Sequence, residues 1–179
     1  MMHMQENKVF QVDQASISKA VEVIAKGGVA ILPADTVYGF FGSATNLETV
    51  NRVYQIKKRE KRKPFVIYTN RQQVGQVNHY ARKYIDSLWP AALCLIINKK
   101  PIISDYFTDN NPTIGVMTAQ NEVISRVTRE VKMPIFGTTC NISGEPEIKQ
   151  AKELMGFVDE VDIMLSGDHI PIYNKPSTI

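Results

Sequence analysis

Short apolar runs alternate with segments of helical period along this chain, and this alternation restricts its fold more than any other feature. A helical stripe from Ile17 to Ile24 ends at Gly27-Gly28, and the apolar run VAILP follows at 29–33. The same reading predicts strands over 64–69, 91–98, 113–118, 134–139 and 161–166, and helices over 45–57, 71–87, 123–131 and 148–156. Near-continuous apolar strands are typical of a sheet covered by helices. We therefore expect an α/β fold with a mixed sheet, since runs as close as 92–97 and 114–117 favour some antiparallel pairing.

Length and composition predict a single domain over 1–179, because 179 residues with 44% hydrophobic and 22% charged residues are ordinary for a globular protein. No apolar stretch approaches the roughly 20 residues that a membrane-spanning helix needs. The start, MMHMQENKVFQVDQ, is too polar for a secretory signal. These features predict a cytoplasmic protein without a membrane partner.

Several common kinds of active site have no signature here. The two cysteines form no CxxC pair and only three histidines are present, which argues against a structural zinc site. Cys94, in the middle of AALCLII, is expected to be plain core. Neither GxxxxGK[ST] nor GxGxxG occurs, and so few histidines suggest no catalytic triad. Any catalysis should therefore depend on positioning and charge stabilisation.

The basic residues are concentrated in one segment. Residues 57–63 carry six basic residues and one acid, a charge of +5, whereas the rest of the chain has 15 basic and 17 acidic residues, a charge of −2. One interpretation is a solvated helix end, where cations suit the helix dipole. The other is an anion site, because the segment lies where a helix gives way to a buried strand and contains arginine, which binds phosphate with two donors.

Two other strands end in polar residues. In PIFGTTCNISGEP, side-chain alternation places Thr139 and Asn141 on one face with Cys140 facing away, which fits either a nucleotide contact or an Asx-turn that ends the strand. In LPADTVYGFFG, a strand is expected to run into a glycine-rich turn, with Thr36 and Tyr38 on one face. The alternative there is a tight turn with a buried tyrosine. The three polar segments could meet in one cleft.

Four ordered motifs carry a family resemblance. PADTVYGF is similar to P-T-[DE]-T-V-Y-G-L, KKR at 57–59 to K-x-R, TTCNISG to T-S-A-N-x-S-G, and KPSTI to [EP]-S-T-[IV]. The chain resembles, over nearly its whole length, the YrdC-like family of threonylcarbamoyl-AMP synthases, which includes YciO-type and YwlC-type relatives.

The resemblance implies a twisted mixed sheet, flanked by helices, around a deep electropositive cavity. It implies synthesis of threonylcarbamoyl-AMP from L-threonine, bicarbonate and ATP with release of pyrophosphate, for the t6A modification of tRNA. Mg²⁺ is expected with ATP, and no protein metal site is expected. Implied partners are tRNA or double-stranded RNA and the transferase proteins of the t6A pathway.

The resemblance also implies site residues. They are Lys57 and Arg59 for catalysis; Lys57, Arg59, Lys63, Thr113, Thr139, Asn141 and Ser177 for ATP; and Thr36 and Tyr68 for L-threonine. Two departures stand out, because Thr139 replaces the family serine and Met117 stands where the family usually has an arginine that would hold the threonine carboxylate. The alternative is therefore a YciO-type paralogue with weak or altered activity that binds RNA or nucleotide.

Overall fold

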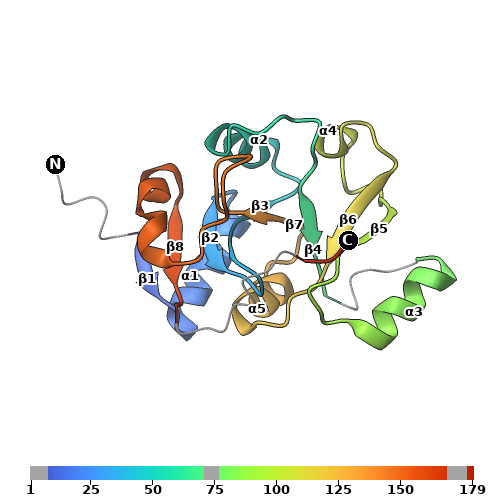
Figure 1. Cartoon of the computed structure of the whole chain (residues 1–179), viewed down its shortest axis with the longest axis horizontal. Helices are drawn as coiled ribbons and strands as arrows, with labels where there is room; N and C mark the ends of the chain where they lie inside the picture. Colours follow the sequence, from blue (N-terminus) through green and yellow to red (C-terminus); the bar gives the residue numbers. More distant parts are fainter. Residues whose placement is uncertain (1–7, 71–76, 169–176) are drawn as a thin grey trace.

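The computed structural model describes residues 8–70, 77–168 and 177–179, which form one eight-stranded sheet with the order β1-β8-β2-β3-β7-β4-β6-β5 (Figure 1). The strands are β1 Val9–Gln11, β2 Ala30–Pro33, β3 Tyr38–Ser43, β4 Val66–Tyr68, β5 Leu95–Asn98, β6 Thr113–Met117, β7 Ile135–Thr139 and β8 Ile163–Ser166. Three pairings are parallel (β1 with β8, β2 with β8, β4 with β6) and the others are antiparallel. The predicted mixed α/β class is confirmed, including the antiparallel pairing of β5 with β6.

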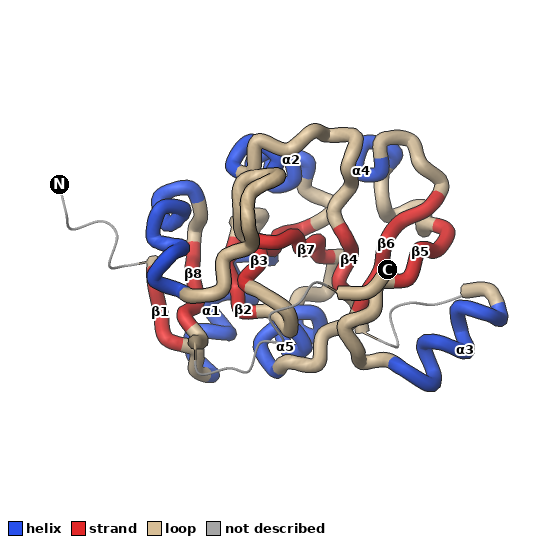
Figure 2. Tube along the Cα trace, viewed as in Figure 1, coloured by secondary structure: helices blue, strands red, loops and turns tan. Residues whose placement is uncertain are grey.

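Helices cover both faces of the sheet (Figure 2). They are α1 Gln14–Ala25, α2 Leu47–Ile56, α3 His79–Leu88, α4 Asp105–Thr108, α5 Glu122–Glu130 and a 3₁₀ helix, η1, Ala151–Glu160. The neighbours Phe40 and Phe41 of β3 point to opposite faces, as strand geometry requires. Phe41 belongs to the core that α1 and α5 cover, and Phe40 to the core beneath α2 and η1.

Three local predictions need correction. The segment YGFFGS is the strand β3, not a glycine-rich turn, because it pairs with β2 on one side and β7 on the other. The helix predicted over 45–57 begins later, because its N-cap is Asn46, whose Oδ1 accepts from the N–H groups of Glu48 and Thr49; Thr45 lies before the helix and contacts the Ser43 hydroxyl at 3.0 Å. The final helix is a 3₁₀ helix shifted to Ala151–Glu160.

Other predictions hold. The helix predicted over 71–87 is confirmed only from His79, because Asn78 is its extended N-cap; it ends at Leu88, and residues 71–76 lie outside the described ranges. Cys94 and Cys140 are free and buried, in agreement with the core role predicted for Cys94. Among the described helices, none is long and apolar enough to cross a membrane.

Candidate functional site

A cavity of about 200 Å³ opens over β3, β7, β4 and β6, and six residues that the sequence singled out line it. These are Thr36, Tyr38, Arg59, Tyr68, Thr139 and Ser177. The floor of the cavity requires glycine at position 137, because a Cβ there would lie 2.5 Å from the Tyr68 ring and 2.6 Å from the Phe41 ring. The two rings pack edge to face at 5.1 Å over this glycine. The three polar segments thus meet in one cleft, as the sequence suggested.

Asp35 fixes the end of the cavity that holds Thr36. Its carboxylate is buried and accepts hydrogen bonds from the backbone N–H groups of Gln120 and Asn121, at 2.7 and 2.6 Å. The Asn121 side-chain amide donates in return to the Pro33 carbonyl at 2.8 Å. These bonds join the segment after β2 to the segment after β6, so Thr36 and Met117 line the same cavity.

The backbone turn at the end of α2 directs the side chains of consecutive basic residues to different places. Lys58 adopts a left-handed backbone conformation (φ 49°), its N–H donates to the Gln55 carbonyl, and the Arg59 N–H donates to the Tyr54 carbonyl at 3.0 Å. This is the Schellman pattern that ends many helices. Lys57 is therefore directed inward and Lys58 outward, while Arg59 reaches the cavity.

Lys57 lies behind the cavity wall. Its side chain is 1% exposed, and Nζ donates to the Thr139 carbonyl, to the Asn141 carbonyl at 2.9 Å and to Asn141 Oδ1 at 2.8 Å. Burial, and to a lesser degree the charge of Arg59, lowers the pKa of Lys57 to about 8. Three acceptors use the three donors of one ammonium group, so Lys57 ties the loop after β7 to the end of α2.

Arg59 lines the cavity with part of its guanidinium unused. Nε donates to the Lys63 carbonyl at 2.9 Å, Nη2 donates to the Pro64 carbonyl at 3.3 Å, and the guanidinium carbon lies 5.3 Å from the centre of the Phe65 ring. Nη1 donates to no group within residues 8–70, 77–168 and 177–179. The guanidinium is thus held in place while one nitrogen stays available for an anion.

Thr139 and Asn141 do share a face, as predicted. The Thr139 hydroxyl donates to Asn141 Oδ1 at 2.7 Å, whereas Cys140 is fully buried in the core. The Asn141 amide nitrogen donates to the Glu145 carbonyl at 2.7 Å. Thr139 lines the cavity, and Asn141 supports it from behind.

Two residues of the predicted ATP set lie away from this cavity. Thr113 is at the opposite end of β6 from Met117, about 13 Å away at the ordinary rise of a strand. Lys63 is largely exposed and pairs with Glu60 at 3.7 Å. Their contacts with ATP, like those of Lys57 and Asn141, stay predictions.

The lining carries little net charge. Arg59 is its one cation and Glu147 its one carboxylate among the described residues, so the strongly electropositive cavity that the resemblance implies is not shown. The sequence reading missed Glu147, although it lies only six residues after Asn141 on the same loop. It also missed the contact of Phe41 with Gly137 in the cavity floor, because β3 and β7 are neighbours in the sheet but far apart in the sequence, and such a contact leaves no local pattern.

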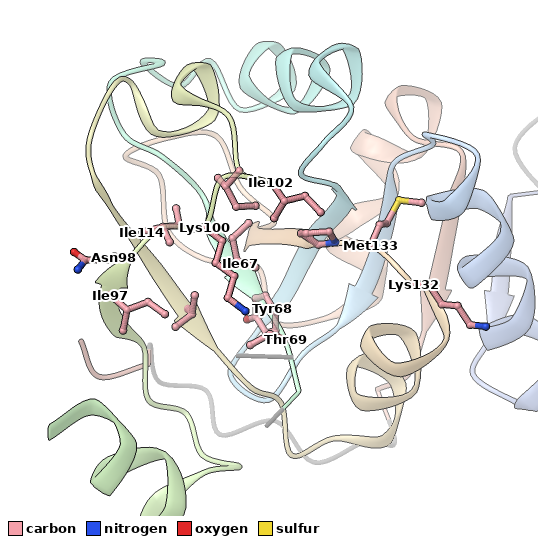
Figure 3. Close-up of a pocket in the computed structure, with 13 residues that line it drawn as sticks. Ile67, Tyr68, Thr69, Ile97, Asn98, Lys100, Ile102, Ile114, Lys132 and Met133 are labelled. Atoms are coloured by element: carbon pink, nitrogen blue, oxygen red, sulfur yellow. The ribbon is translucent and has the colours of Figure 1, made fainter. Parts of the chain in front are cut away.

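A larger cavity, about 330 Å³, contains almost none of these residues (Figure 3). It is mostly aliphatic and is lined by Ile67, Ile97, Ile102, Ile103, Ile114, Val116, Met133 and Pro134 together with Tyr68, Thr69, Asn98, Lys100 and Lys132. In Figure 3, Asn98 and Lys132 point outward at its margins. Tyr68 is the one predicted site residue that it shares with the smaller cavity. We name the smaller one the polar cavity and the larger one the apolar cavity.

No group of three or more histidine, cysteine, aspartate or glutamate side chains that could hold a metal occurs in the described part of the chain. A metal ion could still enter the polar cavity on a substrate, since Mg²⁺ commonly binds through substrate phosphates and one or two carboxylates. Glu147 is the side chain that fits this requirement.

Known proteins are similar to this chain in sequence and in fold. A protein of Methanocaldococcus jannaschii, provisionally named a threonylcarbamoyl-AMP synthase, is 32% identical over 188 residues, covering 96% of this chain and 84% of its own. The threonylcarbamoyl-AMP synthase of Pseudoalteromonas translucida is 27% identical over 183 residues, covering 93% of each chain.

Two solved structures show the same fold. Escherichia coli YciO superposes with a TM-score of 0.84 at 18% identity, over 95% of this chain and 87% of its own. Sua5 of P. abyssi, solved with L-threonine, superposes with a TM-score of 0.82 at 22% identity, over 89% of this chain but 49% of its own. The profile of the Sua5, YciO and YrdC family, described as "Telomere recombination", matches residues 22–179. The chain therefore belongs to the Sua5/YciO/YrdC family.

Proposed function

We propose that this protein is a threonylcarbamoyl-AMP synthase that joins L-threonine, bicarbonate and ATP in the polar cavity. The observation that carries the proposal is that Thr36, Arg59, Thr139 and Ser177, one from each of the four motifs, line one cavity together with Tyr68. The names of relatives that align over more than nine-tenths of this chain support the same activity.

The reaction needs no protein nucleophile, which suits a cavity without a serine–histidine or cysteine–histidine pair among its described lining residues. The threonine amine adds to carbon dioxide with loss of a proton, or reacts with bicarbonate with loss of water, to give a carbamate. A carbamate oxygen then attacks the α-phosphorus of ATP, the bond to the β-phosphate oxygen breaks, and pyrophosphate leaves. The enzyme has to hold the reactants in line and stabilise charge on the phosphates.

Arg59 is the side chain best prepared for the phosphates. Its fixed guanidinium and unused Nη1 would stabilise charge on the transferring group without reorganisation. Thr139 and Ser177 would contact the nucleotide beside it. Lys57 would act through the Thr139–Asn141 loop, whose position it fixes. Mg²⁺ would neutralise phosphate charge when bound.

Thr36, Tyr68 and Met117 form the end of the cavity proposed for L-threonine. The Thr36 hydroxyl supplies a polar contact and the Tyr68 ring an apolar wall. Met117 is buried and cannot pair with a carboxylate. We therefore expect weaker binding of L-threonine than an arginine at this position would give.

The direct test is pyrophosphate release from ATP, Mg²⁺ and bicarbonate, with and without L-threonine. The proposal predicts release that depends on threonine and a product with the mass of threonylcarbamoyl-AMP. Release that is indifferent to every amino acid tested would contradict it.

Two observations favour a second candidate, a YciO-type protein that binds nucleotide or RNA without efficient synthesis. Met117 cannot serve as a cationic anchor for a carboxylate, and Lys58, Lys61 and Arg62, in the same segment as Arg59, are exposed and could contact RNA phosphates. This candidate predicts ATP binding without threonine-dependent turnover, and RNA binding that weakens steeply with salt.

A further inference from the structure

Glu147 brings a carboxylate into the polar cavity without a partner of its own. It is half-buried and lines the cavity together with Arg59, Thr139 and Ser177. Within residues 8–70, 77–168 and 177–179, its side chain takes part in no hydrogen bond or ion pair. Most partly buried carboxylates are paired or hydrogen-bonded, so this one is available to a bound cation or donor.

Its neighbourhood makes an unpaired carboxylate unexpected. The Glu147 charge favours the protonated form of the Lys57 amine, and Glu147 shares the cavity lining with Arg59, the side chain proposed to meet the phosphates. A bare carboxylate there repels a triphosphate. The repulsion becomes an attraction if a divalent cation lies between the two.

We propose that Glu147 is the side chain through which this protein holds the Mg²⁺ that ATP brings into the polar cavity. Mg²⁺ keeps several water molecules and accepts one or two carboxylates beside phosphate oxygens, so a single glutamate is enough. The proposal rests on the proposed function, because it requires ATP in this cavity.

A different reading gives Glu147 the ammonium group of an amino-acid substrate. The mostly neutral lining beside Thr36 and Met117 offers no carboxylate of its own, but Glu147 belongs to the loop after β7, with the nucleotide residues. The metal is therefore favoured, and the ammonium becomes an outcome of the test.

The experiment measures ATP affinity by calorimetry at increasing Mg²⁺ and in excess chelator, for the parent, Glu147→Gln and Glu145→Gln. Glu145 is the matched control, because it is exposed on the same loop and lies outside the cavity lining. We expect Mg²⁺ to raise the ATP affinity of the parent and of Glu145→Gln about tenfold, and that of Glu147→Gln about twofold or less. Without Mg²⁺, Glu147→Gln should bind ATP at least as tightly as the parent.

A second readout follows the metal itself. With Mn²⁺ and ATP, the electron paramagnetic resonance spectrum of bound Mn²⁺ should change in Glu147→Gln and stay as in the parent in Glu145→Gln. Equal Mg²⁺ dependence in all three proteins would overturn the proposal, as would a Glu147→Gln variant that weakens only L-threonine binding. A parent that binds no ATP at any Mg²⁺ concentration would instead overturn the proposed function, and this proposal with it.

Discussion

The two cavities differ in size and in chemistry, and the larger one is not the candidate site. The apolar cavity is larger and mostly aliphatic, whereas the polar cavity is smaller and collects side chains from four motifs far apart in the sequence. Packing can leave an apolar hollow without any function, but it rarely brings an unused guanidinium nitrogen, several hydroxyls and a free carboxylate together. The difference teaches that convergent chemistry, more than volume, identifies the site.

The largest effect is expected from Lys57→Met. The substitution removes the Lys57 donor from three acceptors at Thr139 and Asn141, and the Asn141 carbonyl has no other donor among the described residues. We expect the free energy of unfolding to fall by about 3 kcal/mol and ATP binding to be lost with the loop. Urea denaturation and calorimetry would measure both quantities. Exposed Lys58 is the control, since Lys58→Ala should change neither; a stable Lys57→Met that binds ATP would refute the support role.

Arg59→Ala should weaken ATP binding and leave the fold intact. Loss of a charge-assisted contact with phosphate is worth about 1.5–3 kcal/mol, so ATP affinity should fall roughly 10- to 150-fold. The fold should survive, because among the described residues the Arg59 side chain donates only to two loop carbonyls of its own turn. ATP titration by calorimetry would test this, and unchanged affinity would exclude Arg59 from the site.

Met117→Arg should strengthen the binding of L-threonine at its proposed end of the polar cavity. A cation at this position would pair with the L-threonine carboxylate and raise the affinity for threonine about tenfold or more, while ATP affinity stays within about twofold of the parent. The concentration of threonine that gives half-maximal pyrophosphate release is the readout. If that concentration did not change, Met117 would not face the amino acid.

The pH dependence of stability gives an independent check on Lys57. Because burial lowers the pKa of Lys57 to about 8 from its ordinary value of 10.5, the unfolded chain binds more protons between these pH values. This residue should therefore make the folded state gain stability as the pH rises from about 8 to about 10.5. Buried Cys94 and Tyr68, whose pKa values burial raises, act in the opposite direction.

The comparison that isolates Lys57 is the difference in unfolding free energy between the parent and Lys57→Met, since the other groups titrate in both proteins. That difference should grow with pH in this window. A difference that stays constant would mean that Lys57 keeps an ordinary pKa.

The smallest effect is expected in the apolar cavity. Ile103 is buried and lines it, so Ile103→Val should lower the free energy of unfolding by about 1 kcal/mol. ATP affinity should remain within about twofold of the parent, as measured by the same calorimetry. A large loss of ATP binding would show that the two cavities act together through Tyr68, which lines both.

Sequence reasoning predicted the α/β class and the meeting of three polar segments, because strand periodicity and motif order are local signals. Thr36, Arg59 and Thr139 could be placed in this way. The sequence could not show that Lys57 supports the cavity from behind while Arg59 lines it. The directions of these two side chains depend on the left-handed turn at Lys58 and on acceptors more than 80 residues away. The strand nature of 38–43 was also missed, since its glycines suggested a turn while two neighbouring strands make it β3.

The most direct test of the central claim is to titrate Mg²⁺–ATP into isotopically labelled protein and follow the backbone amide resonances. We predict that the shifts concentrate on Gly39, Arg59, Thr139 and Ser177, around the polar cavity. Shifts that concentrate instead on Ile97, Ile102 and Ile114, around the apolar cavity, would contradict the assignment.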